Sequence, residues 1–413
     1  MTWPIVELQE LALQQKGSIV SGPFGSNIGS RFFVEQGVPV IRGNNLTKGG
    51  RKFVDNGFVY LTDSKAAEFP NCIAIADDVV FTAAGSIGQV GLIPKDARYE
   101  RYVISNKQLR VRLDQVKADP LFVYYWLSSK QMIRYLVGMN NGGAVPLLNI
   151  GIIRRVPVPH PKLKIQKRIA SILSVYDDLI ENNRRRIQLL EQSARLLYKE
   201  WFVHLRFPGH EHVKIKDGVP DGWRKVTVPE IIAINPKEVV KKGSDICYAP
   251  MFSLSTSGMA INTADIEIRQ KATSVKFRNG DTLLARITPC LENGKTGFVK
   301  FLAEGEVACG STEFIVLRGQ TVSPYFTYCL ARTYDFRENA IKSMIGSSGR
   351  QRVQVSCFDD YALGLPSNML LKQFDETASN CFEQIWCLMQ QNTNLANARD
   401  LLLPRLMNGE VEV

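Results

Sequence analysis

The chain carries one short pattern twice: Asp78-Val-Val-Phe-Thr82 and, about 203 positions later, Asp281-Thr-Leu-Leu-Ala285. In both copies an acidic residue precedes a short apolar run of the kind that forms a buried strand. Other paired features keep the same order along the two halves: Trp3 and Trp223, Gly88-Gln-Val-Gly91 and Gly294-Lys-Thr-Gly297, Asp119-Pro120 and Ser323-Pro324, Gly143 and Gly349, and Val156-Pro-Val-Pro159 and Leu363-Gly-Leu-Pro366. Features repeated in one order indicate a repeated structure. The sequence therefore predicts two similar modules.

Each module is expected to be a mixed α/β globule. Short β-prone runs bounded by Gly and Asp predict strands at Val38–Arg42, Val79–Thr82, Leu109–Leu113, Thr282–Arg286 and Phe314–Leu317. Asp119 and Ser323 are good N-cap residues, and each is followed by Pro at the first helical position. Each pair is predicted to start a helix of about four turns.

A long helix is predicted after each module, because apolar residues recur there at alternating spacings of three and four. The first stripe, which contains one stutter, comprises Ile165, Ile169, Ile172, Tyr176, Leu179, Asn183, Ile187, Leu190, Ala194, Leu197 and Trp201. The second comprises Phe374, Ala378, Cys381, Ile385, Leu388, Asn392, Leu395, Ala398, Leu402 and Leu406. We expect the two helices to pack antiparallel; the alternative is that each packs on its own globule. Asn183 and Asn392 could fix the register or mark a hydrated layer.

The predicted fold class is thus α+β, with two mixed α/β domains that are each followed by a long helix, the helices forming an antiparallel coiled coil. The predicted boundaries are residues 1–160 for the first module, 161–206 for the first helix, 207–222 for a linker, 223–366 for the second module and 367–413 for the second helix.

The composition is that of an ordinary globular protein. The 413 residues are 45% hydrophobic and 22% charged, which excludes a largely disordered, collagen-like or purely coiled-coil chain. No apolar run approaches the roughly 20 residues of a membrane span. The first residues, MTWPIVELQE, lack the pattern of a signal peptide. We therefore expect a cytoplasmic protein without membrane contact.

The net charge of +11 lies entirely in the first half. Residues 1–208 hold 28 Lys and Arg against 17 Asp and Glu, whereas residues 209–413 hold 23 of each kind. A basic surface suggests a polyanion such as DNA or RNA, or an acidic partner. The run Arg184-Arg-Arg186 fits either of these equally well.

Cysteine and histidine usage gives little support for a metal site. None of the eight cysteines forms a C-x-x-C pair, which favours buried, reduced thiols. His210-Glu211-His212 could chelate a metal ion, but it lies in the predicted linker and has no further ligands nearby. No metal site is predicted.

Catalytic motifs are incomplete wherever they are approached. Asn293-Gly-Lys-Thr296 resembles the end of a phosphate-binding loop, but Pro289 occupies the required first glycine position. Asp119-Pro-Leu-Phe122 and Asn235-Pro-Lys-Glu238 both depart from the motif with which amino-methyltransferases hold a flipped base. Nuclease carboxylate clusters and hydrolase motifs are not found either. The sequence predicts a protein that does not itself catalyse a reaction.

Several loops suit DNA binding instead. Arg42, Asn44 and Asn45 follow a predicted strand and offer the side-chain forks that read guanine and adenine, and Lys48, Arg51 and Lys52 suit phosphates. In the second module Ser347, Arg350, Gln351 and Arg352 share a glycine-containing loop, and Asn141 lies in the corresponding loop of the first module. The alternative for each loop is a solvated turn.

At this point the chain resembles the DNA specificity subunit of type I restriction-modification systems over nearly its whole length. The strings that carry the resemblance are Ser21-Gly-Pro-Phe-Gly-Ser26, Gly37-Val-Pro-Val-Ile-Arg-Gly-Asn-Asn45, Ala285-Arg-Ile-Thr-Pro-Cys-Leu-Glu-Asn-Gly-Lys295, Gly346-Ser-Ser-Gly-Arg-Gln-Arg-Val353 and Ala398-Arg-Asp-Leu-Leu-Leu-Pro-Arg-Leu-Met-Asn-Gly-Glu410. Ser367-Asn-Met-Leu-Leu-Lys372 departs from the family, which usually has a further Pro and a Glu-Gln pair there, so the resemblance does not fix the start of the second helix.

The resemblance implies a subunit that directs a larger complex to its DNA target. Each module would be a target-recognition domain for one half of a bipartite, asymmetric site, and Arg286, Asn293 and Lys295 would join the DNA-contacting residues. The helices would dock two modification subunits that methylate adenine, and restriction subunits would join them. S-adenosylmethionine, ATP and magnesium would then belong to these partners and not to this chain. Two other classes stay open: a self-contained DNA-modifying enzyme, and a repeat scaffold that binds only protein.

Overall fold

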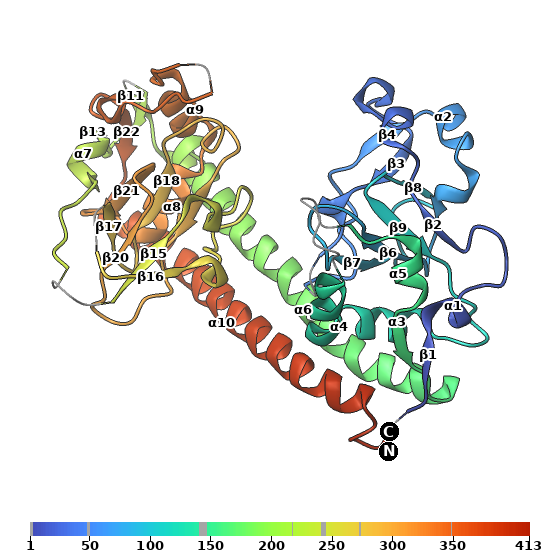
Figure 1. The fold of residues 1–413 in the computed structure, drawn as a ribbon. Coiled ribbons are helices and arrows are strands. Elements are labelled where there is room, and N and C mark those ends of the chain that lie inside the picture. The colour runs from blue at the N-terminus through green and yellow to red at the C-terminus, as the bar shows by residue number, and fades with distance from the viewer. Residues whose placement is uncertain are drawn as a thin grey trace. The chain divides into compact units, whose positions relative to one another are not determined.

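The computed structural model describes residues 3–47, 50–139, 147–216, 218–240, 245–271, 274–347 and 349–413. The chain divides into two compact units. Unit 1 comprises Met1–Glu181 with Asn392–Val413, and unit 2 comprises Asn182–Gln391. We call the sheets and short helices of these units module 1 and module 2 (Figure 1).

Module 1 is built on two four-stranded sheets. The first has the order β2-β9-β6-β7 and is antiparallel throughout, with strands Ile19–Ser21, Gln108–Val111, Val79–Thr82 and Val90–Leu92. The second has the order β4-β3-β8-β5, with strands Val59–Leu61, Val38–Ile41, Tyr102–Ile104 and Ile73–Ala74, and its central pair β3 and β8 is parallel. A short pair joins β1 (Ile5–Glu7) to β10 (Pro157–Pro159). The helices are α1 (Leu8–Leu11), α2 (Asp63–Ala67), α3 (Pro120–Leu127), α4 (Lys130–Gly138) and α5 (Ile150–Arg154).

Module 2 repeats this plan strand for strand. Its antiparallel sheet has the order β14-β21-β18-β19, with strands Ile232–Ile234, Phe314–Gly319, Thr282–Ala285 and Thr296–Phe298. Its mixed sheet has the order β16-β15-β20-β17, with strands Glu267–Arg269, Ile246–Ala249, Ala308–Gly310 and Val275–Phe277. β13 (Arg224–Thr227) pairs with β22 (Ala362–Leu365), the short hairpin β11–β12 covers Ile215–Lys216 and Val219–Pro220, and the helices are α7 (Val228–Ile231), α8 (Pro324–Ala331) and α9 (Tyr334–Lys342). The predicted repeat and strands are confirmed.

The acidic residue of the repeated pattern is a buried anchor in both modules. The carboxylate of Asp78 accepts two hydrogen bonds from the Arg112 guanidinium at 2.9 and 2.7 Å, and Asp281 accepts two from Arg318 at 2.7 Å. Each Asp side chain is 1% exposed. Because removing one partner leaves a buried charge uncompensated, such a pair tolerates substitution poorly. This explains why an acidic residue stands at the head of both patterns.

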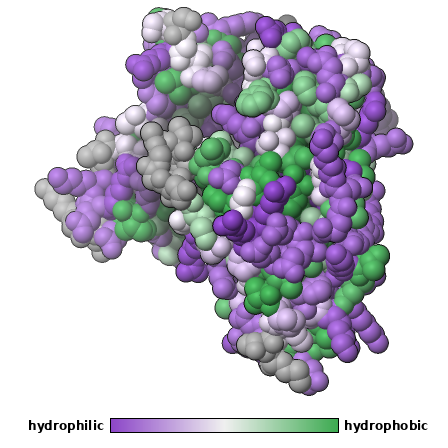
Figure 2. All heavy atoms as spheres, turned by 45° about the vertical axis from the view of Figure 1, so that its right-hand side comes forward, coloured by the Kyte–Doolittle hydropathy of each residue, from purple (hydrophilic) through white to green (hydrophobic). Residues whose placement is uncertain are grey.

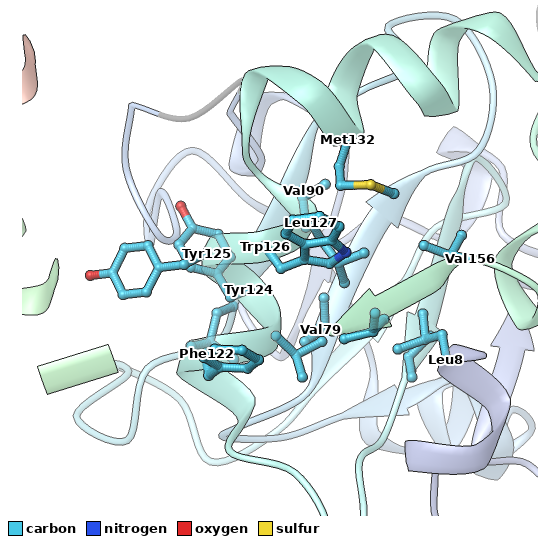
Figure 3. Close-up of a cluster of buried hydrophobic side chains, with 14 of the residues drawn as sticks. Leu8, Val79, Val90, Phe122, Tyr124, Tyr125, Trp126, Leu127, Met132 and Val156 are labelled. Atoms are coloured by element: carbon cyan, nitrogen blue, oxygen red, sulfur yellow. The ribbon is translucent and has the colours of Figure 1, made fainter. Parts of the chain in front are cut away.

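The continuous apolar run of α3 reflects burial on all sides. Figure 3 shows α3 side chains gathered with Val79 and Val90 of the antiparallel sheet and with Leu8 of α1. Leu127 is fully buried, and a Leu side chain buried in this way stabilises a fold by roughly 1.5–3 kcal/mol. The helix thereby covers one face of the sheet and fixes module 1.

The predicted four-turn helices are wrong in length. The Ser129 hydroxyl accepts a hydrogen bond from the backbone N–H of Met132 at 3.2 Å and so caps a new helix, α4, after α3 has ended. Thr333 does the same for α9. Each predicted helix is therefore two shorter ones, because a hydroxyl side chain competes for the backbone at that point.

The two long helices form as predicted. Helix α6 spans Leu163–Tyr198 and continues into a π-helical turn at Lys199–Val203, and α10 spans Asn368–Met407. In unit 2, Asn183 lies 3.5 Å from Gln391 (Nδ2 to Oε1), and the ring of Tyr198, further along α6, lies 6.0 Å from that of Phe374, earlier in α10. The helices therefore run antiparallel. In unit 1, Arg399 of α10 forms an ion pair with Asp177 of α6.

Both predicted packing modes of the helices occur together. Ile169 and Leu173 of α6 join the core of module 1, while Ala194 and Tyr198 join that of module 2. The buried stripe of α6 also differs by one position from the predicted seam. Leu179, a predicted seam residue, is 45% exposed, whereas Ile180 is 4% exposed, so the prediction for Leu179 is wrong.

The polarity of the surface is what the composition of an ordinary globular protein predicts. Hydrophilic residues cover most of the face in Figure 2, and apolar ones form separate groups. Within the described ranges no helix is both long and apolar enough to cross a membrane. All eight cysteines are free thiols.

Candidate nucleic-acid interface

The topology brings several loops of module 1 to one edge, which we call loop edge 1. It comprises residues 22–29, 42–47, 50–58, 83–89 and 105–107, the segments after β2, β3, β6 and β8 and before β4, β7 and β9. Backbone hydrogen bonds join them: Gly22 N–H donates to Gln108 O at 2.9 Å, Ser105 N–H to Ile41 O at 3.0 Å and Ala83 N–H to Lys107 O at 2.7 Å. Loop edge 1 is therefore a connected surface.

The predicted residues Arg42, Asn44 and Asn45 lie on loop edge 1 in different environments. Asn45 is fully buried; its amide donates to Val54 O and Asn56 O, both at 2.9 Å, and its Oδ1 accepts from Arg42 N–H. This side chain positions the loop and is not placed to touch a ligand. Asn44 is exposed, with Nδ2 3.2 Å from Gly57 O, and Arg42 reaches the same carbonyl.

Arg51 and Lys52 face helix α6. Arg51 Nε lies 3.5 Å from a carboxylate oxygen of Glu181, and Lys52 Nζ lies 3.5 Å from one of Asp178. Such half-exposed pairs contribute little stability, but they direct both cations toward the helix. Lys48 and Asn141, two further predicted contacts, lie outside the described residues.

Loop edge 2 is the corresponding surface of module 2 and comprises residues 250–266, 286–295, 311–313, 345–347 and 349–353. Four of the predicted residues come together there. Thr288 and Gln351 exchange hydrogen bonds at 3.0 Å, and the guanidinium of Arg286 donates to Val353 O at 3.0 Å. Ser347 and Arg350 are exposed beside them.

Arg352 belongs to the same loop, but its side chain is already paired with a carboxylate. Its guanidinium donates to both carboxylate oxygens of Glu313 at 2.7–3.0 Å, and this hydrogen bonding raises the pKa of Arg352. A fork already bound to a carboxylate is less available to a base edge.

The turn at 289–295 brings the last predicted residues to loop edge 2. Asn293 is exposed, and Lys295 donates from Nζ to Met251 O at 3.0 Å. Gly294 has a φ of +78°, a left-handed conformation that favours glycine, and its carbonyl accepts from Arg332 at 2.7 Å. The glycine therefore shapes the turn that presents Asn293.

Lys107 is a residue that the sequence reasoning missed. It is exposed on loop edge 1, where its carbonyl is bound by Ala83 N–H. Its structural counterpart in module 2 is Glu313, whose carbonyl is bound by Arg286 N–H at 2.9 Å. A lone lysine between Asn106 and Gln108 carries no pattern; only the repeat alignment could have revealed it.

The chemistry of both edges is that of recognition. Guanidinium, amide and ammonium groups can contact base edges and phosphates. Among the residues that the structure describes, no group of three His, Cys, Asp or Glu is gathered as a metal site.

Comparison with known proteins shows what the chain is similar to. Residues 28–192 match the family model described as the type I restriction modification DNA specificity domain. The MjaIX specificity subunit of Methanocaldococcus jannaschii is 24% identical over 391 residues, covering 91% of this chain and 87% of that protein. The EcoEI specificity subunit of Escherichia coli is 32% identical over 196 residues, covering 46% of this chain and 32% of its own length.

A crystal structure of the type I restriction-modification S subunit from M. genitalium has the same fold. It matches with a TM-score of 0.52 at 14% identity, covering 98% of this chain and 96% of that one. Two similar modules and two paired long helices are therefore an architecture known from a DNA specificity subunit. The chain belongs to the specificity subunits of type I restriction-modification systems, the non-catalytic components of those complexes.

Proposed function

We propose that the two modules each read one half of a bipartite, asymmetric DNA target. The observation that carries this proposal is that one scaffold presents different residues at equivalent places. Lys107 of module 1 corresponds to Glu313 of module 2, and Asn44, which follows β3, corresponds to Phe252, which follows β15. Two readers with one fold and unlike edges suit two unlike half-sites.

The proposed recognition domains are residues 1–160 and 223–366, with 161–206 and 367–413 as the helices and 207–222 as a linker. Among the predicted contacts, Asn44, Asn293, Ser347 and Arg350 are exposed and support a direct role. Arg42, Arg286, Lys295 and Arg352 lie on the edges with internal side-chain partners, which DNA would replace on binding. Gln351 is held on its edge by backbone hydrogen bonds with Thr288. Lys48 and Asn141 stay in the proposal from the sequence alone.

The proposed partners are double-stranded DNA, two modification subunits and restriction subunits. Exposed apolar residues on α6 support docking of protein there: Leu189 is 62% exposed and Leu196, seven positions on, is 51% exposed. A spacing of seven places both on one helix face. S-adenosylmethionine, ATP and magnesium would act on the partners, and the complex would work in the cytoplasm, where prokaryotic DNA lies.

The test is methylation-sensitive sequencing of DNA from cells that carry the complete system. The proposal predicts one methylated motif with two unlike halves separated by a non-specific gap, and no motif when this chain is deleted. The purified chain alone should transfer no methyl group to DNA. A continuous motif, or methylation by the isolated chain, would contradict the proposal.

A further inference from the structure

We propose that each module carries one aromatic wedge, Phe24 on loop edge 1 and Phe252 on loop edge 2, which stacks on a DNA base within the half-site that its module reads. This inference rests on the proposed function. It names side chains that neither the charge pattern nor the predicted contact residues include.

Exposure singles these two residues out. All twenty phenylalanines of the chain lie within the described residues, and only Phe24 and Phe252 are exposed, at 84% and 64%. Each module thus has one exposed phenylalanine. Aromatic side chains normally supply the largest apolar area to a core, so a ring held in water on a recognition edge is available to a ligand.

The backbone holds the Phe24 ring out of the module. Phe24 follows Pro23, and its carbonyl accepts from Asn27 N–H at 2.8 Å. Gly22 lies so close to the next loop that a Cβ there would sit 1.9 Å from Ser105 O. The loop is therefore fixed before DNA arrives, and little conformational entropy remains to be lost.

Phe252 is fixed in a similar way. It lies in the 3₁₀ turn Met251–Ser253 directly after Pro250. Ser253 donates from its N–H and from its hydroxyl to Pro250 O, at 3.0 and 2.7 Å, and Lys295 donates to Met251 O.

Cations on the segments that carry both rings favour a nucleic acid as the partner. Arg31, seven positions after Phe24, donates from its guanidinium to Ser26 O at 3.0 Å, and Lys295 donates to the carbonyl of Met251, which precedes Phe252. Cations on a segment that exposes an apolar ring match a ligand that contains both phosphates and flat bases. Every base has a π-face, so an aromatic side chain can stack on it whatever its sequence.

The two wedges occupy different positions on the common scaffold. Phe24 follows β2, whereas Phe252 follows β15, at the place that Asn44 holds in module 1. The base-pair step that Phe24 contacts in one half-site should therefore differ in position from the step that Phe252 contacts in the other.

The experiment uses the assembled complex with its modification subunits on a duplex that carries the mapped target. 2-Aminopurine replaces one base at a time, since its fluorescence rises when a ring enters between two base pairs and separates it from its neighbouring base. We expect a rise at one step in each half-site, apart from any signal at the base to be methylated. Phe24→Ala should abolish the rise in the half-site of module 1 only and weaken binding on the order of 10- to 100-fold, the size of one stacked base. Phe252→Ala should do the same in the other half-site, and Phe24→Trp should retain the signal.

Each alanine variant is the control for the other, because its unaffected half-site reports a folded complex. Unchanged affinity and fluorescence in both alanine variants would overturn the wedge. Impaired assembly with the modification subunits without DNA would show instead that the rings contact protein, which also overturns it. A wild-type complex that binds target and unrelated DNA equally would overturn the proposed function itself.

Discussion

Lys107 gives the sharpest prediction about how loop edge 1 meets DNA. Its ammonium is exposed, and its backbone is fixed by the hydrogen bond from Ala83. If it contacts one phosphate, Lys107→Ala should flatten the plot of log K against log salt concentration by about 0.9. The loss of affinity would then be about 3.5-fold greater at 50 mM than at 200 mM salt. Target and unrelated DNA should be affected alike, because a phosphate contact carries no sequence information.

Two matched variants sharpen this measurement. Lys95 is 79% exposed at the opposite end of the same sheet, beside Asp77, so Lys95→Ala makes the same change of charge away from the edge. Lys52→Ala removes a lysine that faces Asp178. The assay is titration of fluorescent duplex with the assembled complex at four or more salt concentrations. Equal slopes for the Lys107 and Lys95 variants would refute the assignment of the edge, and a larger change for Lys52 would show that Lys52 leaves its partner to bind DNA.

Three further outcomes are expected. Glu191 is 4% exposed, and its carboxylate accepts hydrogen bonds from Met259 N–H at 2.8 Å and from the Tyr328 hydroxyl at 2.7 Å. Glu191→Ala should therefore lower the free energy of unfolding by about 2–4 kcal/mol, as measured by urea titration. A loss below about 1 kcal/mol would contradict this role. Burial raises the pKa of the Cys247 thiol to about 11. At pH 8, Cys247 should therefore react with iodoacetamide more slowly than the exposed Cys387. Equal reaction rates of the two thiols, measured by mass spectrometry, would contradict this prediction. Inserting four residues after Asn182 adds about 6 Å of helix and should lengthen the non-specific gap of the target by one or two base pairs. Inserting two residues instead rotates the apolar stripe of the helix by about 200° and should disrupt assembly. An active four-residue variant with the original gap would show that the helices do not set the spacing.

The repeat was predictable because both copies keep corresponding features at the same places. The Asp78 and Asp281 patterns record a buried ion pair at the head of a strand, and Pro120 and Pro324 record helix starts. The helix starts depend on neighbouring residues, whereas the arginine partners of Asp78 and Asp281 lie 34 and 37 positions away; these two Asp residues were visible because both copies carry them at the same place.

What the sequence did not reveal depends on which groups meet in the folded chain. Lys52 appeared free until Asp178, 126 positions away, was placed beside it. Leu179 fits the heptad spacing of the predicted seam, yet Ile180 is buried in its place. Asn45 has the side chain of a base reader, yet its hydrogen-bonding groups are used within the loop.

The most direct test of two independent readers is an exchange of residues 1–160 for those of another family member, followed by mapping of methylated sites in cells. If the two modules read independently, one half of the target changes while the other half and the gap are kept. A change in both halves, or in neither, would contradict it.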